Sequence, residues 1–179
     1  MNLASKHILV GITGGIAAYK SAILVRLLKK ANAEVRVVMT QAAQKFVAPL
    51  TLAALSENPV GVDLFDQPPQ HEIRHIAWAD WADLAIIAPA TANIIGKAAG
   101  GIADDLLSGM ILALQCPLVF APAMHHQMWS HPAVQRNVAL LKQYGYHIVE
   151  PGTGDLASGD VGVGRMREPE DILAFVTNL

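Results

Sequence analysis

The chain has 179 residues, of which 53% are apolar and 16% are charged, with a net charge of −2. This length fits one domain with a substantial core, so we assign residues 1–179 to a single domain. The small net charge gives no electrostatic reason to expect nucleic acid or a membrane surface as a partner. One cysteine, Cys116, rules out a disulfide framework and favours a cytoplasmic location. The apolar content is high for a lone monomer, and interfaces of a homo-oligomer are expected to account for it.

The stretch from Lys6 to Lys20 is the most informative. The apolar run 7–12 predicts a buried strand, and Thr13-Gly14-Gly15 follows it. A helical pattern comes next, with these apolar residues predicted on its inner face: Ile16, Tyr19, Ile23, Leu24, Leu27 and Leu28. A glycine turn between strand and helix directs free N–H groups and the positive helix end at an anion. We therefore predict a phosphate-bearing ligand near residues 13–16, although such glycines also simply permit a tight turn.

Strands and helices alternate along the rest of the chain. Further strands are predicted at 33–40, 84–88, 117–121 and 147–150. Helices are predicted at 41–56 with a break near Pro49, at 74–81, 91–101, 106–114 and 132–145, and from Glu168 onward. Residues 59–70 and 151–167 are expected to be loops, the second because it holds five glycines and little periodicity. The alternation predicts an α/β fold with a doubly wound parallel sheet, in which ligands collect beyond the carboxyl ends of the strands.

Four segments together resemble one known family. They are GGIAAYK at 14–20, APATAN at 88–93, PAMHHQMW at 122–129 and GDVGVGRM at 159–166. The chain is similar, over about residues 5–178, to the homo-oligomeric flavin-containing cysteine decarboxylases, and most of all to the phosphopantothenoylcysteine decarboxylases among them. This resemblance implies a flavodoxin- or Rossmann-like three-layer sandwich, FMN as cofactor, and a homotrimer or a larger assembly of trimers such as a homododecamer. Each site is expected to be shared between neighbouring subunits.

The resemblance also implies roles for individual residues. The FMN-binding residues that it indicates are Gly14, Gly15 and Ile16 near the phosphate, and Thr40, Phe46, Thr91, Ala92, Asn93 and Met124 around the remainder. The active-site histidine of the family matches His75, and His125 and Ser158 complete the expected catalytic set. No residue is assigned to a metal.

The implied activity is FMN-dependent oxidative decarboxylation of a small molecule that bears a cysteine carboxylate, as in coenzyme A biosynthesis. FMN takes electrons from the cysteine side chain, and the resulting thioaldehyde loses CO₂ to give an enethiol. Two residues depart from the family pattern: His125 stands in place of an asparagine, and Ser158 stands in place of the cysteine that reduces the enethiol. A hydroxyl cannot replace a redox-active thiol, so we predict that turnover stops at the enethiol. Two alternatives stay open, a peptidyl-cysteine decarboxylase and an inactive FMN-binding paralogue or regulatory subunit.

Three other residue patterns resemble metal-binding or catalytic sites. His71-Glu72-Ile73-Arg74-His75 matches the zinc-protease pattern H-E-x-x-H, but no third ligand follows at a family spacing, so we interpret it as a coincidence. Among His125, His126 and His131 we expect one histidine that faces a ligand and two at the surface. Asp104-Asp105 resembles a catalytic carboxylate pair, but a surface or interface role fits better because adjacent helical residues diverge by about 100°.

Overall fold

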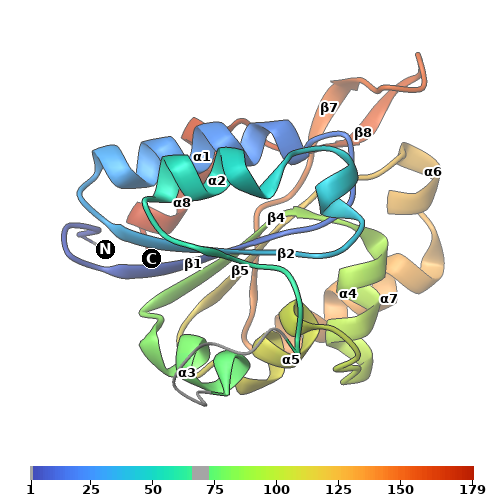
Figure 1. Cartoon of the computed structure of the whole chain (residues 1–179). Helices are drawn as coiled ribbons and strands as arrows, with labels where there is room; N and C mark the ends of the chain where they lie inside the picture. The colour runs from blue at the N-terminus through green and yellow to red at the C-terminus, as the bar shows by residue number, and fades with distance from the viewer. Residues whose placement is uncertain (1, 66–72) are drawn as a thin grey trace.

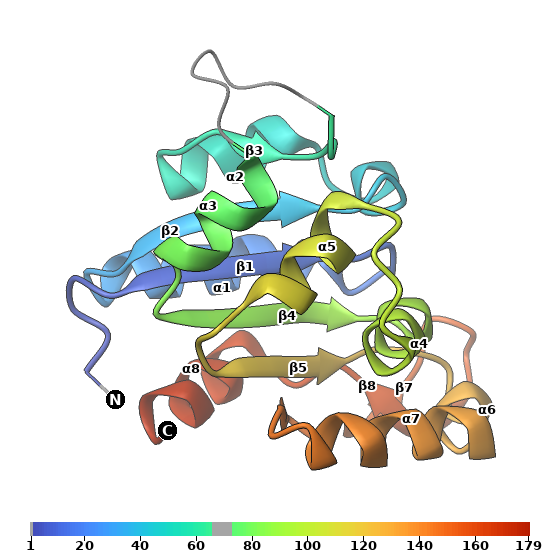
Figure 2. The ribbon, with the colours of Figure 1, turned by 90° about the horizontal axis from the view of Figure 1, so that it is seen from below.

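A computed structural model describes residues 2–65 and 73–179. Its centre is a sheet of six parallel strands in the order β3-β2-β1-β4-β5-β6 (Figures 1 and 2). The strands are β1 His7–Ile12, β2 Glu34–Met39, β3 Val60–Gly61, β4 Leu84–Ala90, β5 Leu118–Pro122 and β6 His147–Ile148. The strand order reverses between β1 and β4, which is the position where doubly wound folds open a crevice for ligands.

Helices cover both faces of the sheet and confirm the predicted three-layer arrangement. Figure 1 shows α1 Ala18–Lys30, α2 Pro49–Ser56 and α8 Pro169–Thr177 on one face. The other face carries α3 Arg74–Trp81, α4 Ala92–Gly100, α5 Leu106–Ala113 and α7 Pro132–Gln143, while a 3₁₀ turn, Ala43–Lys45, follows β2. Two apolar clusters, one on each side, fill the space between sheet and helices. All seven residues of β4 are buried as a result, which explains its lack of polar residues.

The prediction for 151–167 was wrong, because this segment contains an antiparallel hairpin. Its strands are β7 Gly152–Asp155 and β8 Val161–Arg165, and Figure 1 shows it projecting beyond the strand ends of the main sheet. The hairpin extends away from the core, and its strands alternate valine or polar residues with glycine and bury no valine, so the apolar–polar alternation that identifies half-buried strands is missing. Backbone pairing alone defines it. The short helix α6 His126–Trp129, which the sequence analysis did not separate from its surroundings, packs beside β8.

The inner face predicted for the first helix was also partly wrong. Leu24 and Leu28 are buried as expected. Ile16, Tyr19 and Ile23 instead have exposed fractions of 63%, 56% and 43%. The face of the helix that packs against the sheet also carries Lys20, Ser21 and Val25, which are buried. The polar side chains of Lys20 and Ser21 are hydrogen-bonded inside the protein. The second row of apolar residues on this helix therefore faces outward, as it does in helices that meet another subunit.

The Asp104-Asp105 pair has a structural role. The Asp105 side chain accepts a hydrogen bond from the Ser108 N–H at 2.8 Å and so caps α5. Lys97 Nζ lies 2.6 Å from a carboxylate oxygen of Asp104 and 2.7 Å from one of Asp105. Burial opposes the charge of Lys97, but the hydrogen bonds to both carboxylates outweigh it and raise its pKa.

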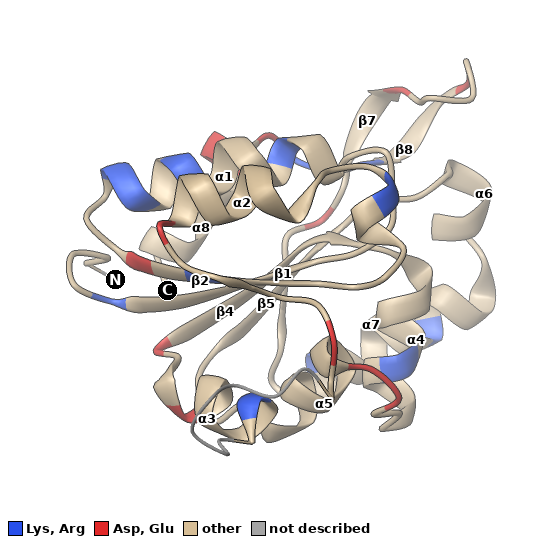
Figure 3. Cartoon of the chain, viewed as in Figure 1, with Lys and Arg blue, Asp and Glu red and all other residues tan. Residues whose placement is uncertain are grey.

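Acidic and basic residues are scattered over the ribbon in Figure 3, and neither sign dominates the view. In the described parts of the chain, no helix combines the length and apolarity that crossing a bilayer demands.

Candidate active site

A pocket of about 540 Å³ lies at the carboxyl ends of β1, β4 and β5. Four segments line it: the turn 14–17 after β1, Thr91 and Ala92 after β4, residues 123–125 after β5, and residues 155–158 of the hairpin. The turn and the β4 segment flank the point where the strand order reverses. The pocket therefore occupies the position that parallel topology predicts for a ligand.

Two buried hydroxyls hold the loops of this switch point together. Thr13 Oγ1 donates to the Pro89 carbonyl at 2.7 Å and accepts the Thr91 N–H at 3.1 Å. Ser21 Oγ donates to the Ala88 carbonyl at 2.6 Å. Because both side chains are almost fully buried, these bonds are shielded from water and fix the β1 turn against the end of β4.

The turn at Gly14 has the features of an anion site. Within residues 2–65 and 73–179, the N–H groups of Gly14, Ile16 and Ala17 have no hydrogen-bond partner. They precede the first residue of α1, where the helix dipole adds positive potential. A side chain at Gly14 would collide with Ala42, so glycine is required for the close packing of this turn. These free donors fit a phosphate group.

Lys20 places a buried cation in the wall of the pocket, but its charge is already compensated. Its Nζ donates to Glu168 Oε1 at 2.8 Å and lies 3.4 Å from the Met166 carbonyl. Arg165 also donates to Glu168, at 2.7 Å. The hydrogen bond from Lys20, with the help of Arg165, lowers the pKa of Glu168. This ion-pair network joins the start of α1 to the end of the hairpin.

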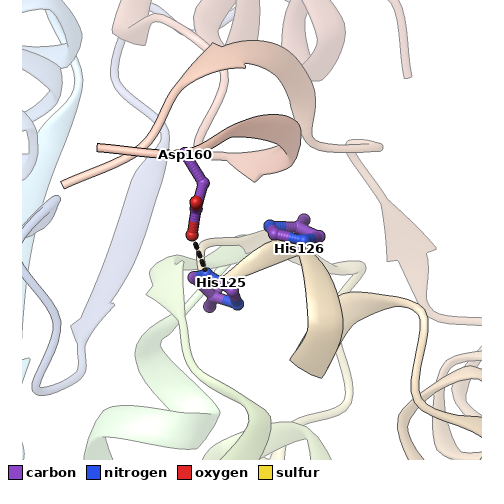
Figure 4. Close-up of side chains that lie close together, drawn as sticks. All are labelled: His125, His126 and Asp160. Atoms are coloured by element: carbon purple, nitrogen blue, oxygen red, sulfur yellow. Dashed lines mark hydrogen bonds and ion pairs between the residues drawn. The ribbon is translucent and has the colours of Figure 1, made fainter. Parts of the chain in front are cut away.

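His125 and Ser158 both contact Asp160, which lies between β7 and β8. Figure 4 shows the contact between His125 and Asp160. His125 Nε2 is 2.8 Å and Ser158 Oγ is 3.1 Å from the same oxygen, Oδ2 of Asp160. His125 Nδ1 accepts the Gln127 N–H, which assigns the ring proton to Nε2. The hydrogen bonds from His125 and then Ser158 lower the pKa of Asp160. The serine thus donates to the carboxylate rather than to the histidine, so these residues do not form a nucleophilic triad.

The hairpin is fastened to the segment after β5 by a close backbone approach. The Met124 N–H donates to the Gly164 carbonyl at 2.9 Å. Gly164 has a φ of +153°, and a Cβ there would collide with the Met124 carbonyl oxygen. This glycine is therefore needed for the hairpin to close one side of the pocket.

Of the residues predicted for the site, the structure brings eight together in the pocket lining: Gly14, Gly15, Ile16, Thr91, Ala92, Met124, His125 and Ser158. Four others are outside this lining. Thr40 follows β2 at the same edge of the sheet, Phe46 is half exposed, and Asn93 is exposed in the first turn of α4. His75 lies in the first turn of α3, on the face of the sheet opposite α1.

The sequence analysis missed several lining residues. Residues 155–157 belong to the segment 151–167 that the sequence predicts to be a loop, and no local pattern indicates that they face a ligand. Lys20 was read as part of a helix pattern, and only its distant partner Glu168 explains its burial. Asp160 belonged to a recognised motif, but its link to His125 spans 35 positions and has no local signal.

Two histidine patterns suggested metal sites in the sequence: the H-E-x-x-H pattern at 71–75, and the group of His125, His126 and His131. His71 and Glu72 of the H-E-x-x-H pattern lie outside the described residues. His131 caps the start of α7 through an Nδ1 that accepts the Ala133 N–H at 3.2 Å, and it is separate from the pocket lining.

Comparisons with known proteins agree on one family. A family model described as Flavoprotein matches residues 1–179. The chain is 50% identical over 171 residues to the coenzyme A biosynthesis bifunctional protein CoaBC of Bacillus subtilis, covering 96% of this chain and 42% of that protein. Its identity to the CoaBC protein of Haemophilus influenzae is 49% over 178 residues, covering 99% of this chain and 44% of the relative. The chain thus spans less than half the length of these curated relatives.

Solved structures of several decarboxylases have the same fold as this chain. A C-to-S mutant of PPC decarboxylase complexed with pantothenoylaminoethenethiol superposes with a TM-score of 0.88 at 34% identity, covering 97% of both chains. The FMN-dependent cysteine decarboxylase SpaF gives 0.83 at 35% identity, covering 99% of both chains. The peptidyl-cysteine decarboxylase EpiD gives 0.83 at 26% identity, with 97% of this chain and 99% of that chain covered.

Proposed function

The chain belongs to the flavoprotein family, and on this basis we propose that it binds FMN and oxidatively decarboxylates a cysteine-derived carboxylate, with phosphopantothenoylcysteine as the first candidate substrate. The observation that carries the proposal is the pocket at the switch point, where an anion-binding turn, the β4 loop and the glycine-rich hairpin meet. Together with the relatives' activities, this arrangement supports an enzyme of the lyase class.

The residues present fit the cofactor. The free N–H groups of Gly14, Ile16 and Ala17 are donors for its phosphate. Thr91, Ala92 and Met124 line the space next to this turn and offer the mainly apolar walls that a flat ring system needs. Thr40, Phe46 and Asn93 remain proposed contacts on its periphery.

When bound, FMN supplies the acceptor for the two electrons that leave the substrate's cysteine side chain. The chain's own residues orient the substrate and handle protons. His125 carries its ring proton on Nε2 beside Asp160, and its ring forms part of the pocket wall. It can therefore donate a hydrogen bond to a substrate carboxylate that displaces Asp160.

Ser158 supports a reaction that ends at the enethiol. It stands where the resembling family has its reducing cysteine, and its hydroxyl donates to Asp160 instead. A hydroxyl cannot be the redox-active proton donor that a thiol is, so the two electrons taken from the substrate would stay on the flavin and the enethiol would not be reduced to the saturated thiol. The solved C-to-S mutant of PPC decarboxylase contains an enethiol ligand, which supports the same end point.

A homo-oligomer forms part of the proposal, with a trimer as its basic unit. Ile16, Tyr19 and Ile23 make an exposed apolar row on and before α1, and Leu50 at the start of α2 is 79% exposed. Covering this surface with another subunit removes it from water. Because His75 lies outside the pocket lining of its own chain, we propose that it acts in the pocket of a neighbouring copy. The single cysteine, Cys116, supports the cytoplasm as the proposed location.

Anaerobic incubation of the purified FMN-loaded protein with phosphopantothenoylcysteine tests the proposal. We expect the visible absorbance of oxidised flavin to bleach, and the substrate to lose the mass of CO₂ plus two hydrogens. Peptides that end in cysteine are tested in parallel. Turnover of the peptides alone would assign the chain to peptide modification. Bound FMN with no bleaching by either substrate class would favour a regulatory flavin-binding protein and contradict an enzyme.

A further inference from the structure

Three potential metal ligands gather at the edge of the pocket. His125 caps the start of α6, His126 is the first residue of this helix, and Asp160 lies between β7 and β8 (Figure 4). One ring nitrogen of each histidine and one carboxylate oxygen of Asp160 lie within 4.8 Å of one another. The two rings are close, with a centroid separation of 4.2 Å. A helix and a hairpin from distant parts of the chain thus present three donor groups to one point.

His126 has an unmet polar group. Its Nδ1 is buried and has no hydrogen-bond partner within residues 2–65 and 73–179. Leaving a buried polar atom unpaired is unfavourable, because the atom loses its hydrogen bond to water. Gly162 limits the space around this side chain, because a Cβ there would be 2.7 Å from His126 Cβ. The ring is therefore held next to His125 by packing, and no described protein group is hydrogen-bonded to its Nδ1.

The geometry points to a binding site for a divalent transition-metal ion, with Zn²⁺ as the representative, formed by His125, His126 and Asp160. Imidazole nitrogens and a carboxylate oxygen are ligands that this class of ion prefers. In a tetrahedral complex with bonds of about 2.1 Å, neighbouring ligand atoms are about 3.4 Å apart. The cluster has to contract modestly around an ion, and the His125–Asp160 contact has to open from 2.8 Å.

The side chains have the freedom to make this change. The side chain of Asp160 is 53% exposed and that of His125 is 28% exposed, so both can rotate without disturbing the core. An ion would take the position of the hydrogen bond between His125 Nε2 and Asp160 Oδ2. Three protein ligands leave one coordination position open, and because His125 lines the pocket, a ligand in the pocket can reach it.

This site differs from the one that the histidine pattern suggested. His131 is occupied as the cap of α7, and Asp160 takes the place of a third histidine. An ion and a substrate carboxylate would compete for His125, but ion binding is measured without turnover, so a failure of this site and a failure of the proposed decarboxylation are distinguishable.

Calorimetric titration of the full purified chain with Zn²⁺ tests the site. We expect one ion per chain. Asp160→Asn keeps the shape of an exposed side chain and should weaken binding at least about tenfold, as should His126→Gln. His131→Ala and His75→Ala are matched controls, since each removes an imidazole outside the cluster, and they should leave the affinity unchanged.

Two results would overturn the site. One is an absence of stoichiometric Zn²⁺ binding by the parent chain. The other is binding that does not follow the cluster. Either Zn²⁺ still binds to both Asp160→Asn and His126→Gln, or binding is lost in His75→Ala or His131→Ala, and in each case the ion would reside elsewhere. Circular dichroism of each variant verifies that it is folded, and Asp160→Asn gives a readout even where His126→Gln does not fold.

Discussion

His125 Nε2 donates a 2.8 Å hydrogen bond to Asp160 Oδ2 and thereby connects the start of α6 to the tip of the hairpin. The two residues are 35 positions apart, and with Gly164 against Met124 they attach the hairpin to the rest of the site. The side of the pocket formed by residues 155–158 consequently depends on a small number of contacts.

The stabilisation that the His125–Asp160 contact gives the hairpin should decrease at low pH. The hydrogen bonds from His125 and Ser158 lower the pKa of Asp160, so its carboxylate stabilises the docked hairpin above the pKa that Asp has in an unfolded chain. This contribution is lost as the pH falls through the lowered value, below about pH 4. Hydrogen exchange of amides 156–163 as a function of pH measures it. In Asp160→Asn this acid-dependent step should disappear, and an unchanged step would assign it to another group.

Restoring the family residues should change the product. The double variant His125→Asn with Ser158→Cys regains an amide beside the substrate and a thiol that can reduce the enethiol. We expect the saturated thiol to become the main product from phosphopantothenoylcysteine, whereas the parent chain should release the enethiol. Mass spectrometry distinguishes the two by two hydrogens. His131→Asn serves as the control substitution, and continued release of enethiol by the double variant would contradict the coenzyme A assignment.

Gly164→Ala should detach the hairpin. Its Cβ collides with the Met124 carbonyl oxygen, and the φ of +153° is unfavourable for alanine. We expect a loss of about 1–3 kcal/mol in the free energy of unfolding together with weaker FMN retention. Urea unfolding and flavin fluorescence measure the two effects.

Gly109→Ala is the matched control for this substitution. Gly109 lies inside α5, and nothing approaches within 4 Å of a Cβ built there. Alanine should stabilise this helix by about 0.5–1 kcal/mol. A Gly164→Ala variant as stable as this control would show that the close approach to Met124 is unimportant.

The exposed row on α1 should support assembly. Ile23→Arg places a charge in the middle of an apolar surface that we propose is covered by another subunit, so the molecular mass in solution should fall to that of one chain. Light scattering after size-exclusion chromatography measures the mass. Tyr144→Arg is the control, because Tyr144 is also half exposed but lies at the end of α7 on the other face of the sheet. Equal masses for both variants and the parent would place the interface elsewhere.

Local patterns predicted most of the main fold. The helix at 74–81 and the break at Pro49 have the predicted bounds, and the buried strand at 84–90 extends only two residues further than expected. The expectations failed where short-range patterns carry no information. Strands β7 and β8 are rich in glycine and their alternate valines are exposed, so they do not have the apolar face of a half-buried strand. Strand β3 lies inside the segment 59–70 that was expected to be a loop. The first helix has two apolar rows, and periodicity cannot tell which of them faces the sheet. His75 matched a family position, but its place in the site depends on a second subunit and stays a prediction.

The sequence alone determined the main alternation of strands and helices and the glycine turn after the first strand, because hydrophobic periodicity and glycine chemistry act over a few residues. Only the tertiary structure decided which distant side chains meet. Lys20 pairs with Glu168 across 148 positions, and Asp160 joins His125 and His126 at the pocket edge. Such pairs form because the parallel sheet brings the carboxyl ends of its strands to one edge, where chain folding sets distances that no local pattern encodes.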